Sequence, residues 1–415
     1  MAKRKDPVAA AAIPMSMRER WNIMGFVMRN DRVISNEDNV CRALEKWPEF
    51  KGMLSYDEFH RRYFVTLGGT RRQLDDTFIR SLQLQLQREF GIPDLKFYIV
   101  KSACTMHADK NITNEPKDYF ETLKWDGTDR IKYVLSDIFG AAGTEYIHQV
   151  SANFFKMIVA RVYEPGCKVD NIIVFKGPQG QYKSTAFEVL MGKGMYLSVT
   201  SQITNKDFYL DMQGKLLCEV AELDSFKGAD VSRIKSVLST SVDTFRAPYA
   251  SASQDHPRQG IFVGSTNESY FLKDTTGNRR YWIVRCDGSV NIDSLKEQRD
   301  QLFAEAVHRY KNKESWWEVP EAEQRANAEL YRQPDTWEDI IQEYLVGHTQ
   351  ITTKQIMSDA LTMNAEKQTP YAQQRVGEIM KLHGWKSVQP REGSKKGKRR
   401  WIKIESDDRD LDIIN

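Results

Sequence analysis

One short stretch of the sequence, GPQGQYKS at residues 177–184, combines residue types that bind phosphate groups. A loop of the form GxxxxGK[ST] uses backbone N–H groups at a helix start, a lysine for the phosphate oxygens and a hydroxyl for magnesium. Gly177, Lys183 and Ser184 stand at those places, but Tyr182 replaces the second glycine. The backbone angles of that position cost a tyrosine about 1–3 kcal/mol. The spacing predicts a working ATP site in which Tyr182 could slow hydrolysis.

The residues around this loop have the pattern that such a loop requires. The apolar run NIIVF before it predicts a buried strand, and TAFEVLM after the lysine and serine predicts the start of a helix. Ser184 is the predicted ligand of Mg²⁺. The predicted ATP contacts are Gly177, Pro178, Gln179, Gly180, Gln181, Tyr182, Lys183, Ser184 and Thr185. A strand, turn and helix that bind no ligand remain the alternative interpretation.

The elements that must position this loop are alternating helices and short apolar strands. The runs KLLCEV, QGIFVGST and RRYWIV predict further buried strands of an α/β layered fold. We predict a P-loop core with a helical lead-in at residues 111–320, after a small helical or α+β module at 36–110. Three short helical patterns and a basic hairpin predict a winged-helix-like unit at 335–404. Residues 1–35 are predicted to be a flexible basic leader and 405–415 an acidic tail.

Composition restricts the class of protein further. The chain has 415 residues, 40% of them hydrophobic, and a net charge of only +3, so DNA binding requires local basic patches. The five cysteines form no C-x-x-C pair, which is typical of reduced thiols. The seven histidines lack metal-ligand spacing. No window approaches the roughly 20 apolar residues of a membrane span, so we expect a cytoplasmic protein.

The order of the motifs resembles the virulence-associated protein E family, phage and genomic-island ATPases related to superfamily 3 helicases. KDYFETLKWDGTDRI, the phosphate loop, KLLCEVAELD and IFVGSTNESYFLKDTTGNRRYWIV together carry the likeness, over roughly residues 114–284. The resemblance implies an AAA+ or superfamily 3 helicase-like fold, ATP hydrolysis and assembly into a ring. The family usually has glycine where this chain has Tyr182.

The resemblance also implies roles for individual residues. LLCEVAEL matches the strand whose acids hold magnesium and polarise water, which makes Glu219 and Glu222 the candidates, with Glu219 as the metal ligand. Asn267 matches the position that senses the γ-phosphate. Arg279 or Arg280 matches the arginine donated to a neighbouring subunit's nucleotide. The alternatives are a solvated carboxylate and a pair of surface arginines.

Two basic stretches are candidates for DNA contacts. In the first, VSRIKSVLSTSVDTFRAPYA, the aromatic residues could stack on bases or belong to the core of a hairpin. The second, KSVQPREGSKKGKRR at residues 386–400, could be a wing that contacts phosphates or a solvated basic loop. Trp385 and Trp401 flank it and indicate that its ends are anchored in a core. The predicted nucleic-acid contacts are Lys235, Arg246, Arg375, Lys395, Lys396, Lys398, Arg399 and Arg400.

Together these patterns predict a DNA-stimulated ATPase and helicase that forms a ring, with a hexamer as the expected state, on single-stranded or forked DNA. No primase acids are evident, so priming would come from a separate protein. The alternative is a DNA-binding initiator or regulator that uses ATP only to assemble. A nuclease is disfavoured because no further set of metal ligands is evident in the sequence.

Overall fold

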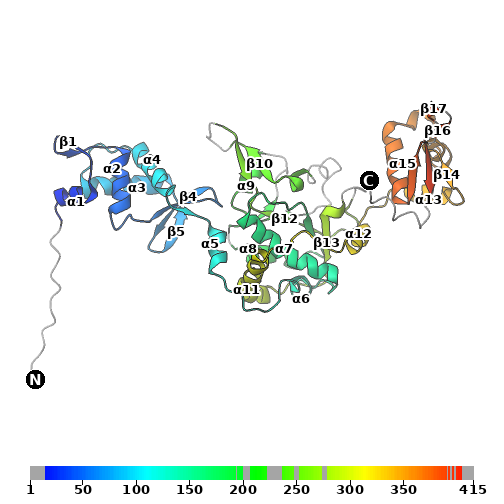
Figure 1. The fold of residues 1–415 in the computed structure, drawn as a ribbon, viewed down its shortest axis with the longest axis horizontal. Coiled ribbons are helices and arrows are strands. Elements are labelled where there is room, and N and C mark those ends of the chain that lie inside the picture. The colour runs from blue at the N-terminus through cyan, green and yellow to red at the C-terminus, as the bar shows by residue number, and fades with distance from the viewer. Residues whose placement is uncertain are drawn as a thin grey trace, which may run out of the picture.

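The computed structural model describes residues 15–192, 194–199, 206–221, 236–246, 252–272, 278–389, 391–392, 395–396 and 399–403. Its elements form three successive units along the long axis, blue to cyan, cyan to yellow, and orange to red (Figure 1). Four groups of buried apolar side chains hold them together, two of them in the central unit. Among the described residues, no helix combines the length and apolar character needed to cross a membrane.

The N-terminal unit is a small α+β layer. Its sheet has the order β5-β4-β3-β6, and Leu54 and Val65 from this sheet pack in one core with the helices. Its elements are α1 (Met17–Met24), β1 (Met28–Arg29), β2 (Arg32–Val33), α2 (Glu37–Lys46), β3 (Leu54–Asp57), β4 (Arg62–Leu67), β5 (Thr70–Gln73), α3 (Asp76–Phe90), α4 (Phe97–Ala108) and β6 (Ile112–Thr113).

The start of this unit corrects one prediction. Ser16 and Glu19 form a reciprocal capping box at the beginning of α1, which stabilises the helix start. Met24 and Val33 are buried in the N-terminal core. The prediction of a flexible leader through residue 35 is therefore wrong for residues 17–33, and residues 1–14 lie outside the described residues.

The central unit contains the phosphate loop and a parallel sheet. Its elements are α5 (Glu115–Thr122), α6 (Val134–Asp137), α7 (Glu145–Tyr163), β7 (Ile172–Lys176), α8 (Lys183–Met191), β8 (Tyr196–Val199), α9 (Lys206–Asp211), β9 (Leu217–Ala221), β10 (Val242–Phe245), β11 (Gln254–Pro257), β12 (Ile261–Thr266), a 3₁₀ turn (Asn278–Arg280), β13 (Tyr281–Arg285), α11 (Ile292–Lys311) and α12 (Glu321–Glu329). The five sheet strands have the order β13-β7-β12-β9-β8 and all pair in parallel. The predicted α/β layered fold is thus confirmed, and the structure shows that its central sheet is parallel.

Both faces of this sheet are covered. Side chains of a strand point alternately to its two faces, so Ile173 and Phe175 of β7 pack with α7, α8 and α11, while Ile172 and Val174 pack on the other side. This burial on both faces explains why the strands are continuous apolar runs rather than alternating ones.

The connections that leave β7 and β12 diverge at the carboxyl edge of the sheet. After β7 the chain enters α8, which packs on one face, whereas Phe271 and Leu272 after β12 pack on the opposite face. These two strands are neighbours in the sheet. In open α/β sheets, the crevice at such a divergence is where ligands bind.

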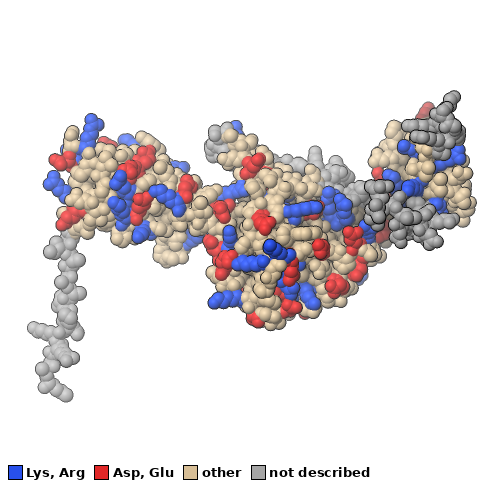
Figure 2. All heavy atoms as spheres, in the orientation of Figure 1, with Lys and Arg blue, Asp and Glu red and all other residues tan. Residues whose placement is uncertain are grey.

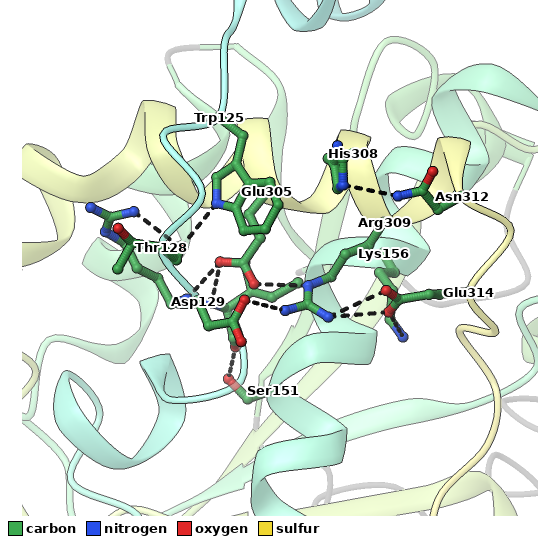
Figure 3. Close-up of polar contacts among 12 residues, drawn as sticks. Trp125, Thr128, Asp129, Ser151, Lys156, Glu305, His308, Arg309, Asn312 and Glu314 are labelled. Atoms are coloured by element: carbon green, nitrogen blue, oxygen red, sulfur yellow. Dashed lines mark hydrogen bonds and ion pairs between the residues drawn. The ribbon is translucent and has the colours of Figure 1, made fainter.

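A buried polar network fixes the lead-in segment WDGTDRI against α7 and α11 (Figure 3). One oxygen of the fully buried Glu305 accepts hydrogen bonds from the backbone N–H groups of Arg130 and Ile131, at 2.6 and 3.0 Å. Its other oxygen accepts from Nε of Arg309 at 2.8 Å. Arg309 also pairs with Asp129 at 2.7 Å. The network orders the segment that precedes the phosphate-loop strand.

The C-terminal unit combines short helices with an antiparallel sheet of order β14-β18-β15. Its elements are α13 (Glu338–Tyr344), β14 (Gln350–Ile351), α14 (Thr353–Gln355), a π-helical turn (Ile356–Ala360), a 3₁₀ turn (Ala365–Lys367), α15 (Pro370–Leu382), β15 (Trp385–Val388), β16 (Arg391–Glu392), β17 (Lys395–Lys396) and β18 (Arg400–Lys403). Trp385 and Trp401 are buried in its core, which confirms the prediction that the basic stretch is anchored at both ends.

Candidate functional site

The phosphate loop, residues 177–182, connects β7 to α8 at the crevice. A Cβ atom at Gly177 would lie 2.4 Å from the backbone oxygen of Cys286 and 2.7 Å from the side-chain oxygen of Gln181, so only glycine fits there. The Gly177 N–H donates to the carbonyl of Thr266 at 3.0 Å, which ties the loop to the end of β12. The Gln181 oxygen is buried and has no hydrogen-bond partner among the described residues. The loop therefore contains a buried polar group that is not satisfied within the described part of the chain.

Tyr182 adopts the backbone conformation that glycine favours. Its φ and ψ angles are 61° and 24°, and it is the residue directly before the first turn of α8. This left-handed conformation costs a non-glycine residue about 1–2 kcal/mol. The side chain is 58% exposed, so the ring lies largely in solvent instead of filling the loop. The chain thus keeps the loop geometry at an energetic cost.

The start of α8 combines backbone donors that receive no side-chain cap from Tyr182 with a lysine. No side chain caps this helix, so the first N–H groups are not satisfied by a capping residue. The Lys183 ammonium donates to the carbonyl oxygens of Gly177 and Pro178, at 3.0 and 2.7 Å. Burial lowers the pKa of Lys183. An anion at this position would meet both the helix dipole and a cation.

Three hydroxyl groups converge on the carboxylate of Glu219, which is buried in β9 with 1% exposure. Ser184 and Ser265 donate to its Oε1 atom at 3.1 and 2.7 Å, and Tyr196 donates to Oε2. Burial, followed by the hydrogen bond to this carboxylate, raises the pKa of Tyr196, so its hydroxyl stays protonated. Within the described ranges, no lysine or arginine forms an ion pair with Glu219. A buried carboxylate without a cationic partner is costly, and proteins commonly resolve that cost with a metal ion.

A cavity of about 450 Å³ lies between the loop and the end of β12, and Ser184 and Ser265 connect it to Glu219, which does not line it. Because β12 lies between β7 and β9 in the sheet, its carboxyl end lies between the phosphate loop and the strand of Glu219. Ser265, Thr266 and Asn267 from that end line the cavity together with the loop, Ser184 and Thr185. Asn267 is exposed. The structure thus brings the predicted loop residues, Glu219 and Asn267 to one edge of the sheet.

Arg279 and Arg280 lie at the opposite end of the strands, where the parallel strands begin. They precede β13, whose first residue pairs with the start of β7 and whose last residue pairs with Lys176, next to the phosphate loop. Five residues of parallel strand, about 16 Å, therefore separate them from the loop of the same chain. Arg279 is exposed, and Nε of Arg280 is buried without a hydrogen-bond partner in the described part of the chain.

Several predicted residues are not described. Glu222, Lys235 and Lys398 lie outside the described residues, and only the backbone of Lys395 and Lys396 is described, in β17. Near the first basic stretch, Arg246 is exposed directly after β10.

Phe245, in contrast, is a core residue of the β10–β11 hairpin. It is 8% exposed, and its ring lies 4.1 Å from that of His256. Of the two interpretations of the aromatic residues, the core interpretation is therefore correct for Phe245, while Tyr249 lies outside the described residues.

Arg375, predicted to contact DNA, has partners within the protein. Its guanidinium forms two hydrogen bonds of 2.8 Å with the carboxylate of Asp335 and lies 3.8 Å from the ring centre of Trp337. Both its edge and its face are thus engaged within the protein, which links α15 to the chain before α13, and its contact with DNA stays a prediction.

The remaining cations of this unit are arranged differently. Arg399 is exposed and, with Lys354 and Lys381, lines a polar groove beside α15. Arg400 lies 3.4 Å from Gln350. Over the whole molecule, positive and negative side chains are interspersed on the face in view (Figure 2), in keeping with the small net charge.

Sequence reasoning did not find Tyr196 or Ser265. Ser265 lies two residues before Asn267, the predicted sensor, and is recognisable as a hydroxyl at a strand end. No local signal marks Tyr196, because its proximity to Glu219 depends on the pairing of β8 with β9.

Comparison with known proteins gives a family and a fold. The model of the virulence-associated protein E-like domain matches residues 120–335. No curated protein matches the chain. The apo structure of the NrS-1 C-terminal region (305–718) is similar with a TM-score of 0.50 at 12% identity, covering 85% of this chain and 96% of that one. An A-form structure of the same region has a TM-score of 0.47 at 12% identity, with the same coverage. At this identity the first likeness concerns the fold alone, and the second carries no argument.

Proposed function

Because the chain belongs to the virulence-associated protein E-like family, we propose that it is an ATP hydrolase that acts on DNA as a superfamily 3-like helicase in phage or mobile-element replication. The observation that carries the proposal is the hydrogen bond between Ser184, at the start of α8, and the buried Glu219. A hydroxyl beside a buried carboxylate offers the oxygen donors that Mg²⁺ prefers, next to a helix start suited to phosphate. The proposal includes a P-loop triphosphatase core and a winged-helix-like C-terminal unit.

The residues present fit ATP and Mg²⁺. The space beside Gly177 admits no side chain, the first N–H groups of α8 lack a capping side chain, and Glu219 has no cationic partner in the described ranges. We assign the phosphates to the loop residues 177–182 with Lys183 and Thr185, and the cation to Ser184 and Glu219. When bound, Mg²⁺ neutralises phosphate charge that develops during transfer.

The hydrolytic water is proposed to be oriented by groups at the carboxyl edge of the sheet. Asn267 lines the cavity from the end of β12, which suits a sensor of the γ-phosphate. Glu222 is the residue directly after β9 in the sequence and is proposed as the general base, while Glu219 is proposed to hold the cation.

The separation of the arginines supports hydrolysis between subunits. Arg279 and Arg280 are one strand length from their own phosphate loop, so they could complete only the site of another chain. An arginine supplied from a neighbour makes hydrolysis depend on assembly. We therefore propose a ring, with a hexamer as the expected state.

DNA contacts are proposed at two places. Arg246 is exposed directly after β10, and Lys235 precedes it in the sequence. The C-terminal unit contributes Lys395, Lys396, Lys398, Arg399 and Arg400, which suit phosphate contacts. Primer synthesis would come from a separate protein.

The decisive experiment measures ATP binding and hydrolysis by the full chain, with Lys183→Ala as the test variant and Lys168→Ala as its control. Lys168 is 82% exposed and precedes β7, so the length of that strand separates it from the loop and its replacement should change neither quantity. We expect Lys183→Ala to lose hydrolysis and most ATP binding, since it removes the cation at the phosphates. Equal ATP affinity in wild type and Lys183→Ala would refute the nucleotide site.

A second candidate, a DNA-binding regulator that uses ATP only to assemble, is favoured by the conformation of Tyr182. Strand separation on a forked duplex distinguishes the two candidates. ATP-dependent unwinding that is lost in Glu222→Gln supports the helicase, and DNA binding with ATP-driven assembly but no unwinding supports the regulator. Mass measurement with an ATP analogue and single-stranded DNA tests the ring in either case.

A further inference from the structure

Tyr196 has no assigned role, yet it makes the contact to Glu219 that comes from the outermost strand of the sheet. Its hydroxyl donates a hydrogen bond to Oε2 of Glu219, and no other described residue donates to that oxygen. We infer that Tyr196 is a positioning residue, which orients the Glu219 carboxylate so that its Oε1 atom holds Ser184 in place to bind Mg²⁺. This inference rests on the proposed nucleotide site.

The pairing of β8 with β9 explains how Tyr196 reaches Glu219. Ser198 is the partner of Glu219 in the register, and Tyr196 lies two residues before it. Residues two apart in a strand share a face, so the tyrosine ring lies on the same face as Glu219 and approaches it diagonally. The position is thus determined by the backbone of two paired strands, a rigid support for a functional side chain.

The two oxygens of Glu219 have different surroundings. Oε2 faces Tyr196, while Oε1 faces the hydroxyls of Ser184 and Ser265, and both serines lie on the cavity side. A carboxylate held at one oxygen cannot rotate freely about its last bond. Without the tyrosine hydroxyl, Oε2 would be a buried charged oxygen with no donor, and rotation would relieve that cost at the expense of the serine contacts.

The direction of the hydrogen bond from Ser184 to Glu219 gives these two residues different roles. A hydroxyl has one proton and two lone pairs, so Ser184, which donates its proton to Glu219, keeps its lone pairs for a cation. Glu219, the other residue assigned to the cation, accepts hydrogen bonds from three hydroxyls, and Tyr196 stands behind it. Such partners behind a metal ligand typically change metal affinity by about 10–100-fold when removed.

The test compares the affinity of the full chain for a non-hydrolysable ATP analogue in EDTA and in Mg²⁺. The quantity of interest is the gain in affinity that Mg²⁺ provides. We expect Tyr196→Phe to reduce this gain about 10-fold or more, while its affinity in EDTA stays within about twofold of wild type. Ser265→Ala, which removes the other supporting hydroxyl, should reduce the gain in the same direction.

Tyr163→Phe is the matched control, because Tyr163 donates in the same way to a glutamate, Glu121, at 2.6 Å on the surface of the same unit. It should leave the gain unchanged. If wild type fails to bind the analogue at all, the proposed function is wrong. If wild type binds with a Mg²⁺ gain and Tyr196→Phe shows the same gain, or loses affinity equally in EDTA, the positioning role is refuted.

Discussion

Replacing Glu305 by alanine tests whether the network of Figure 3 holds the lead-in segment onto the central unit. The carboxylate is fully buried and receives three hydrogen bonds, two from the backbone of Arg130 and Ile131 and one from Arg309. Its removal leaves two backbone donors unsatisfied, one of them on the fully buried Ile131. The perturbation therefore affects the anchor of the segment and not only one side chain.

The expected magnitude follows from these contacts. Each buried donor left without an acceptor costs about 1–3 kcal/mol. Arg309 is partly compensated, because it keeps Asp129 and the 41% exposed Glu314 as partners. We therefore expect a loss of about 3–5 kcal/mol in the free energy of unfolding, the range found when one member of a buried charged pair is removed. For a unit of this size, that loss lowers the melting temperature by roughly 6–20 °C.

Thermal and urea unfolding of the full chain measure the effect, and two variants separate its parts. Glu305→Gln keeps an oxygen for the two backbone donors and loses only the contact with Arg309, so it should cost about 1–2 kcal/mol. Asp129→Ala removes a 53% exposed partner of Arg309 and should cost less than about 1 kcal/mol. A Glu305→Ala protein that melts within about 2 °C of wild type would show that the lead-in is not held by this network.

Three further predictions concern single positions. Tyr182→Gly relieves the strain of a left-handed backbone and should speed single-turnover ATP hydrolysis, so slower turnover would contradict the prediction. The free energy of unfolding should change by less than about 1 kcal/mol, because relief of strain offsets the greater entropy of glycine in the unfolded chain. Gly177→Ala introduces a Cβ 2.4 Å from a backbone oxygen and should abolish analogue binding, whereas Gly180→Ala meets no atom within 4 Å, so its effect should be limited to strain from its φ of +79°. Burial acts to raise the pKa of Asp335, but hydrogen bonds from Arg375 outweigh it and hold the pKa below its usual value. This pair therefore stabilises the fold above the unfolded pKa of about 3.9 and loses that effect as the pH falls. Asp335→Asn should flatten the acid side of a profile of melting temperature against pH.

What the sequence predicted correctly depended on short-range patterns. The strand, loop and helix around Lys183 are consecutive in the chain, and their spacing is enough to define them. The acid of β9 and the end of β12 could be predicted because each follows an apolar run directly. Parallel strands align their carboxyl ends, so these three pieces reach one edge of the sheet once they belong to it.

What the sequence could not predict depended on partners distant in the chain. Tyr196 reaches Glu219 only because β8 pairs with β9, and strand order has no local signal. Arg375 looked like a free cation, but its partner Asp335 is 40 positions away in the sequence. The leader was misjudged because residues 17–33 are polar on average, although Met24 and Val33 supply the apolar contacts that fold them.

The charges of the candidate site are held by neutral groups instead of by each other. Lys183 bonds to two backbone carbonyls and Glu219 to three hydroxyls, and no ion pair joins these two described residues. Had they formed a salt bridge, a nucleotide and its cation would first have to break it, at a cost that rises with burial. Held by neutral partners, the ammonium can exchange weak carbonyl contacts for phosphate oxygens, and the carboxylate keeps its orientation. The proposed ATP and magnesium site would therefore take up its ligands without first breaking an ion pair between these two residues.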